Sequence, residues 1–147
     1  MATTIQDSTL INCPVEKIFS YTTEAKNWPV WQSFIMEAEQ TSQGPWCIGA
    51  TFKGVSRLMG ISMKWTGKAS EYEPNKMWSK DISCGSMFIH ENAEYVPLKE
   101  GIEFSISYEM KIGGFLKLFS PMIVASMRRE TKKSLNKLKN IIEKTDG

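Results

Sequence analysis

The stretch EFSISYEMKIGGFLKLFSP, residues 103–121, changes its hydrophobic period partway along, and this change constrains the fold more than any other feature of the sequence. Up to Met110 apolar side chains alternate with polar ones, which is typical of a strand with one buried face. Beyond Gly114 the apolar residues recur every three or four positions, which is typical of an amphipathic helix. A strand therefore passes into a helix through only two glycines, and the helix is expected to lie close to the sheet from which it starts.

The helix is expected to run from about Phe115 to Lys144, with one apolar stripe along its whole length. At about 1.5 Å per residue it would be about 45 Å long, which is longer than the predicted strands. Pro121 is expected to kink it or to mark a separate first turn, because proline cannot donate a backbone hydrogen bond. The stripe consists of Leu116, Phe119, Ile123, Met127, Thr131, Leu135, Leu138 and Ile142.

The other strands are predicted from alternation and from short connections rich in glycine, proline and asparagine, which are typical of an antiparallel meander. Two short helices are expected after the first strand, over residues 14–24 and 27–34. A sheet with one apolar face needs a cover, and the C-terminal helix is the longest predicted element. The fold class expected is α+β: a six- or seven-stranded curved antiparallel sheet wrapped around the long C-terminal helix. The predicted strands cover residues 4–12, 34–40, 50–58, 61–73, 76–84, 86–96 and 102–111.

The order of several motifs resembles the START-type or SRPBCC superfamily, in particular its polyketide cyclase/dehydrase and lipid-transport-like branch. The motifs are INCPVEKIFSYTTEAKNWPVWQ, IGATFKG, ASEYEPNKMW, EYVPLKEGIEFSISYEM and MRRETKKSLNKLKNIIE. The resemblance spans nearly the whole chain and implies a single ligand-binding domain of the helix-grip fold over residues 1–147. It also implies a cavity between sheet and helix for a hydrophobic ligand, such as a lipid, isoprenoid or polyketide. The superfamily holds carriers, receptors and enzymes, so the resemblance specifies the fold far better than the activity.

The inner faces of the predicted elements indicate the walls of such a cavity. Methionine side chains are flexible and polarizable, and Met63, Met87, Met110, Met122 and Met127 are all expected to point inward. The alternative is that these residues fill the core completely. Two tryptophans and a phenylalanine around Pro29 would lie at the cavity mouth or simply pack. The candidate ligand-binding residues are Trp28, Trp31, Phe34, Phe52, Met63, Trp65, Met87, Ile89, Phe104, Ile106, Tyr108, Met110, Phe119, Ile123 and Met127.

Catalysis has weaker candidates. By alternation Glu71 and Glu91 fall on the inner side, where burial would raise the pKa of a carboxyl group and suit it to proton transfer. With Tyr95 or Tyr108 as a hydrogen-bond donor, such a group could serve the cyclisation or dehydration of a ketone-rich substrate. The alternative is that a bulge or the rim of the sheet leaves both glutamates, which lie near strand ends, solvated. His90 shares a face with outward-pointing residues, so a catalytic role is not expected of it.

Other site types lack their motifs. Three cysteines at wide spacing and a single histidine do not suggest a disulfide framework or a metal site, and no cofactor-binding motif appears. The segment from Lys117 to Lys144 contains eight lysines and arginines but only two glutamates, so the helix could touch an anionic membrane transiently. A solvated basic face is the simpler interpretation. Aromatic residues do not interleave with these cations, so no nucleic acid is expected.

The start of the chain lacks the pattern of a secretory signal, and no apolar run reaches the length of a membrane span, so a cytoplasmic location is expected. Three functions stay open: binding of a small hydrophobic molecule, a cyclase or dehydratase using the same cavity, and a module that receives a partner protein. The oligomeric state is not specified.

Overall fold

The computed structural model describes residues 2–144 and contains a seven-stranded antiparallel sheet in the order β1-β7-β6-β5-β4-β3-β2. The strands are β1 (Thr3–Ile11), β2 (Ile35–Gln40), β3 (Thr51–Leu58), β4 (Ile61–Glu73), β5 (Met77–Cys84), β6 (Met87–Leu98) and β7 (Gly101–Ile112). The helices are α1 (Val15–Thr23), α2 (Trp28–Trp31) and α3 (Ser120–Lys144), with two 3-10 turns, η1 (Ala25–Asn27) and η2 (Gly114–Phe119).

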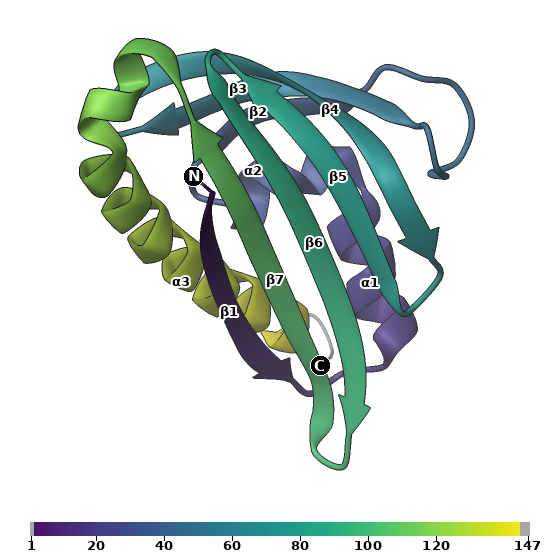
Figure 1. Ribbon diagram of the computed structural model, residues 1–147. Coiled ribbons are helices and arrows are strands. Elements are labelled where there is room, and N and C mark those ends of the chain that lie inside the picture. Colours follow the sequence, from purple (N-terminus) through teal and green to yellow (C-terminus); the bar gives the residue numbers. More distant parts are fainter. Residues whose placement is uncertain (1, 145–147) are drawn as a thin grey trace.

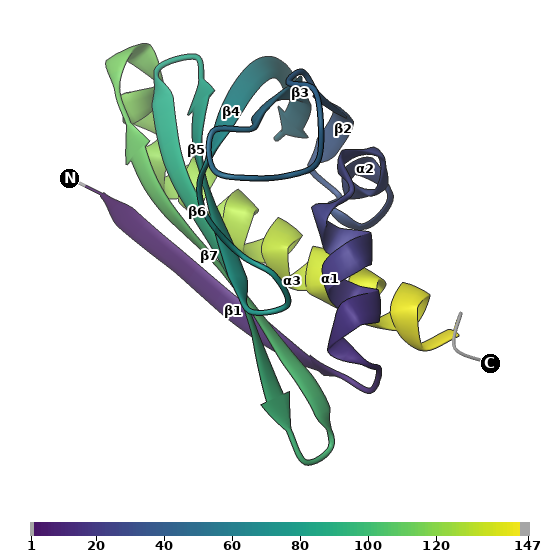
Figure 2. The same cartoon turned by 90° about the vertical axis from the view of Figure 1, so that its right-hand side faces the viewer.

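The sheet is curved, and its helices lie on the concave side (Figures 1 and 2). Strands β2 to β7 form a continuous meander, whereas β1, which is followed by α1 and α2, pairs with β7 at the edge of the sheet opposite β2. In Figure 1, α3 starts beyond the end of β7 and runs back beside β1. The predicted helix-grip fold, with two short helices after the first strand, is therefore confirmed.

The junction between β7 and α3 is fastened to the hairpin between β5 and β6. The Gly113 N–H donates to the Ser86 carbonyl oxygen at 3.1 Å, and the Ser86 hydroxyl donates back to the Gly113 carbonyl oxygen at 2.6 Å. Gly114 has φ +59°, a conformation that glycine adopts without steric cost. The chain then forms the 3-10 turn η2 before α3 begins at Ser120. Of the two outcomes expected at Pro121, the separate first turn is the one that occurs.

The apolar stripe of α3 faces the sheet as predicted. Leu116 and Phe119, in η2, are partly buried against the core, and from Ile123 onward the stripe residues are at most 3% exposed. Met122 was expected to point inward, and this prediction is wrong because its side chain is 53% exposed. Successive residues of a helix are about 100° apart, so when Ile123 and Met127 face the core their neighbour Met122 is turned toward solvent.

One end of the concave face is filled by aromatic rings. Trp46, from the loop before β3, has its ring centroid within 5.5 Å of the rings of Phe52, Tyr72 and Trp78. The Tyr95 hydroxyl lies among them, 2.7 Å from the Trp78 indole nitrogen, whose N–H donates to it. This close packing leaves the free space of the concave face at the other end, near the hairpins after β3 and β5.

Candidate ligand-binding site

An apolar cavity lies between the concave face of the sheet and α3, beside the hairpins that join β3 to β4 and β5 to β6. The centres of water-sized molecules can occupy a volume of about 70 Å³ inside it. When all space between the atoms and the open mouth are counted, the volume is about 700 Å³. The interior is therefore narrow. Its wall consists of Trp28, Gln32, Phe34, Ile35, Ser56, Leu58, Ile61, Met63, Trp65, Lys80, Ile82, Cys84, Met87, Ile89, Glu91, Tyr108, Met110 and Met127.

A buried ion pair belongs to this wall. Lys80 and Glu91 face each other across β5 and β6, with Nζ and Oε1 3.2 Å apart and both side chains 3% exposed. The Lys80 ammonium also lies 3.5 Å from the centroid of the Trp28 ring, a cation–π contact. Burial lowers the pKa of Lys80, and the charge of Glu91 opposes that shift. Since a lone buried charge is very unfavourable, each member depends on the other.

Tyr108 adds a hydroxyl beside the pair. It is the register partner of Glu91 on β7, and its ring packs edge-on against Phe34. Burial raises the pKa of Tyr108 well above its ordinary value, and the charge of Glu91 and a side-chain hydrogen bond to Glu91 raise it further. The phenol is protonated at neutral pH and donates its hydrogen bond to the Glu91 carboxylate.

Three residues that line the cavity each have a buried polar atom with no hydrogen-bond partner among the described residues: Gln32 Nε2, Trp65 Nε1 and Glu91 Oε2. A buried polar atom without a partner costs about 1–3 kcal/mol. Two of them are donors and one is an acceptor. The cavity is therefore lined mainly by apolar residues, and three of its lining residues carry unused hydrogen-bonding atoms of both kinds.

Comparison with known proteins places the chain in a family. The family model described as polyketide cyclase / dehydrase and lipid transport matches residues 2–143. The chain belongs to this family. No curated protein sequence matches it closely enough to count as a relative.

Solved structures share the fold of this polyketide cyclase / dehydrase and lipid transport family member. The Zhui aromatase/cyclase from a Streptomyces species is 9% identical, with a TM-score of 0.85 over 100% of this chain and 97% of that one. A protein from Thermus thermophilus is 14% identical, with a TM-score of 0.80 over 99% and 100% of the two chains. A START superfamily protein from Mycobacterium smegmatis is 11% identical, with a TM-score of 0.77 over 97% and 98%. At such identities the likeness shows the fold alone.

In this family member, the predicted ligand-binding residues divide between the cavity wall and the packed core. The residues that line the cavity are Trp28, Phe34, Met63, Trp65, Met87, Ile89, Tyr108, Met110 and Met127. The others pack elsewhere in or against the core: Trp31, Phe52, Phe104, Ile106, Phe119 and Ile123. In this second group, Phe52 packs against the Trp46 ring of the aromatic end, and Phe104 packs against Trp31 and Tyr95.

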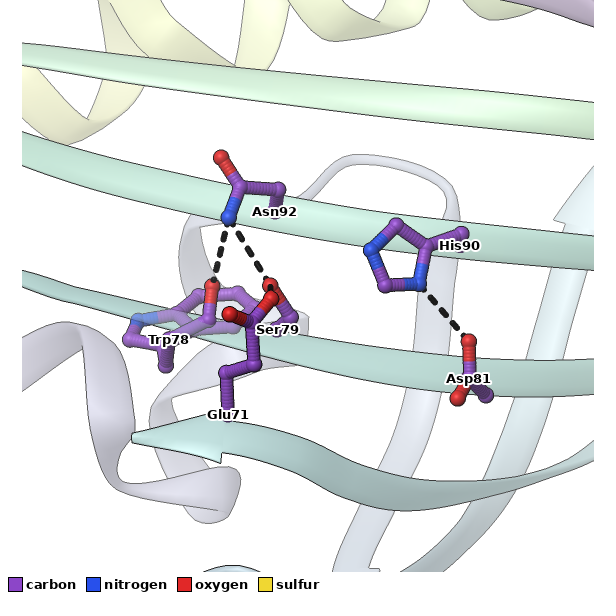
Figure 3. A network of polar contacts seen from close by, with 6 residues as sticks. All are labelled: Glu71, Trp78, Ser79, Asp81, His90 and Asn92. Atoms are coloured by element: carbon purple, nitrogen blue, oxygen red, sulfur yellow. Dashed lines mark hydrogen bonds and ion pairs between the residues drawn. The ribbon is translucent and has the colours of Figure 1, made fainter. Parts of the chain in front are cut away.

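Two of the catalytic candidates lie away from the cavity. Glu71 was expected to face inward, and this prediction is wrong because a bulge between Ala69 and Glu71 reverses the alternation and leaves Glu71 exposed. Its carboxylate accepts a hydrogen bond from the Ser79 hydroxyl at 3.0 Å on the outer face, as Figure 3 shows. Tyr95 is buried in the aromatic end, 2.6 Å from the Thr22 hydroxyl. Glu91 and Tyr108 are the candidates that the structure brings together.

His90 points outward as predicted. It forms a 2.7 Å contact with Asp81 on the outer face, also drawn in Figure 3.

Within residues 2–144 no group of histidine, cysteine, aspartate and glutamate side chains is arranged to hold a metal ion, and no helix could span a membrane.

Sequence reasoning missed Lys80 and Gln32. The signal for Lys80 was present, since Trp78, Lys80, Ile82 and Cys84 alternate along β5 and share its inner side. Lysine is almost never fully buried unless it is paired, so a lysine within a strand is expected to point to solvent. Gln32 follows a short helix and has no periodic pattern that would place it.

Proposed function

We propose that this protein binds a small, largely apolar molecule in the cavity between the sheet and α3, and so carries or sequesters it. The observation that supports the proposal most strongly is the mainly apolar cavity wall, to which both the sheet and Met127 of α3 contribute. Family membership agrees with this function, because the family description includes lipid transport.

The narrow interior bears on the affinity. A ligand that buries about 200 Å² of apolar area gains about 5 kcal/mol, and the loss of its free motion offsets much of that gain. Micromolar binding therefore needs added polar contacts or a wall that adapts. Met63, Met87, Met110 and Met127 supply adaptable side chains, since methionine changes shape at small energetic cost.

Extraction and native mass spectrometry of the purified protein would detect a co-purifying apolar molecule. Titration with the neutral fluorescent probe N-phenyl-1-naphthylamine would measure binding directly. Met127→Trp fills the cavity and is expected to weaken probe binding at least tenfold, whereas Met122→Trp, on the exposed side of α3, leaves it unchanged. Equal probe binding by the two variants would contradict this cavity as the binding site.

A second candidate function is a cyclase or dehydratase in the same cavity. The unpartnered Oε2 of Glu91, beside the protonated hydroxyl of Tyr108, favours it because this pair could remove and return a proton. One solved structure with this fold is an aromatase/cyclase. Turnover of a poly-β-ketone that is lost in Glu91→Gln, while the variant stays folded, would support this activity. Unchanged turnover in that variant would refute it.

A further inference from the structure

Three residues that line the cavity carry hydrogen-bonding atoms that no described residue uses. Glu91 Oε2 is an acceptor, and Trp65 Nε1 and Gln32 Nε2 are donors. The three residues are 2%, 5% and 3% exposed, and they come from β6, β4 and the segment after α2. Polar atoms buried at the wall of a cavity are favourable when a ligand supplies their partners. Together these atoms favour a ligand with both a donor and an acceptor.

The charge of the wall limits the ligand further. Lys80 is already paired with Glu91, and its ammonium lies against the rings of Trp28 and Trp78 at 3.5 and 4.8 Å from their centroids. Among the described residues that line the cavity there is no other lysine, arginine or histidine. A carboxylate ligand would therefore bring a second negative charge toward Glu91, in apolar surroundings and without a free cation. The wall therefore disfavours an anionic ligand. It does not require a cationic one either, because Glu91 is already paired with Lys80.

We infer that the cavity selects uncharged ligands that carry a hydroxyl group, over hydrocarbons of the same shape and over carboxylates. The ligand hydroxyl donates to Glu91 Oε2, and a ligand oxygen accepts from Trp65 Nε1 or Gln32 Nε2. The hydrocarbon binds less well because these polar atoms stay without partners, and the carboxylate binds less well because of its charge. This inference rests on the proposed binding function and narrows it to neutral alcohols and phenols.

Three probes of one shape test the selectivity: naphthalene, 2-naphthol and 2-naphthoate, titrated into the full chain near neutral pH. Under these conditions the naphthol is neutral and the naphthoate is charged. We expect 2-naphthol to bind at least tenfold more tightly than naphthalene and 2-naphthoate to bind most weakly. Indole N–H signals in nitrogen–proton NMR spectra report the contact directly, and the signal absent from Trp65→Phe identifies that indole.

Two variants separate hydrogen bonding from simple fit. Trp65→Phe keeps an aromatic wall but loses the N–H, so the advantage of naphthol over naphthalene is expected to fall at least threefold. The double variant Lys80→Met/Glu91→Gln removes both charges together and avoids a lone buried ion. In it the discrimination between 2-naphthol and 2-naphthoate is expected to shrink at least tenfold. Val30→Ala, at an exposed position, serves as the control for both.

The failure of the inference differs from the failure of the proposed function. If naphthalene and 2-naphthol bind equally well in the cavity, or 2-naphthoate binds as tightly as 2-naphthol, the selectivity is refuted and apolar binding stands. If the three probes do not bind, or if Met127→Trp leaves their binding unchanged, the cavity is not a binding site and both proposals fall.

Discussion

Removing one member of the Lys80–Glu91 pair is predicted to destabilise the protein far more than removing both. At a separation of 3.2 Å and an effective dielectric constant near 20, the attraction between the two charges is about 5 kcal/mol. Loss of one partner leaves the other charge buried and uncompensated, which costs about 3–5 kcal/mol in proteins. Lys80→Met and Glu91→Gln are each expected to lower the free energy of unfolding by that amount.

The double variant Lys80→Met/Glu91→Gln leaves no charge behind. Its free energy of unfolding is expected to fall by only about 1–2 kcal/mol, so the coupling between the two sites would exceed about 3 kcal/mol. Urea unfolding followed by tryptophan fluorescence gives these values by linear extrapolation. A constant slope against urea concentration would show that the single variants still unfold from a compact native state.

Lys53 and Glu39 provide a matched control, because their N–O distance is also 3.2 Å but their side chains are 60% and 62% exposed. Lys53→Met is expected to cost less than about 1 kcal/mol, since solvent screens an exposed pair. The reasoning about burial fails if Lys80→Met costs no more than Lys53→Met. It also fails if the losses of the two single variants simply add in the double variant.

Three further predictions concern other buried features. Gly54→Ala is expected to lower the free energy of unfolding in urea by about 3 kcal/mol, because the new Cβ would lie 2.0 Å from the Glu37 carbonyl oxygen. Gly67→Ala on β4, where the nearest atom is 3.5 Å away, should lower it by less than about 1 kcal/mol. Equal losses in the two variants would contradict this. Tyr95→Phe is expected to lower the free energy of unfolding by about 2 kcal/mol, because it removes the hydroxyl that accepts a hydrogen bond from the buried Trp78 indole N–H. A loss below about 0.5 kcal/mol would show that this hydrogen bond contributes little to stability. Folding raises the pKa of Tyr108 above its ordinary value of 10.0, so its contribution to stability is complete below that pH and is lost as the pH rises above it. Folding lowers the pKa of Lys80, so up to the ordinary lysine pKa of 10.5 its titration raises stability with pH and opposes the effect of Tyr108. Above pH 10.5 this opposition has ended, and Tyr108→Phe should reduce the loss of stability with rising pH by about 1.4 kcal/mol per pH unit. An unchanged slope would refute the assignment.

The fold could be predicted because its strongest patterns are local. Alternation up to Met110 and helical spacing beyond Gly114 identify β7 and α3, and the short connections leave few ways to order the strands. The error at Glu71 has a different origin. One extra residue in β4 reverses the face of everything beyond it, and no residue of that segment indicates a bulge.

The candidate site was harder to predict because it depends on which part of the concave face stays unfilled. Phe104 and Met110 both point inward from β7, yet only Met110 reaches the cavity. Phe104 instead packs against the rings of Trp31 and Tyr95, with centroids 5.9 and 5.1 Å away, and the alternation of β7 does not indicate these contacts with α2 and β6. Alternation predicts which face is buried, whereas the cavity depends on contacts between distant segments.

The ion pair joins the filled and the open parts of the concave face. The Lys80 ammonium lies against Trp78 of the aromatic end and against Trp28 of the cavity wall, and both rings are at most 1% exposed. Glu91 lines the cavity and keeps its Oε2 without a hydrogen-bond partner within residues 2–144. Because the rings hold the ammonium and the ammonium holds Oε1, the position of Oε2 is set before a ligand arrives, which lowers the entropy cost of binding. An apolar pair of the same volume would cost the fold less, but it would offer a ligand no fixed acceptor and no charge with which to exclude a carboxylate.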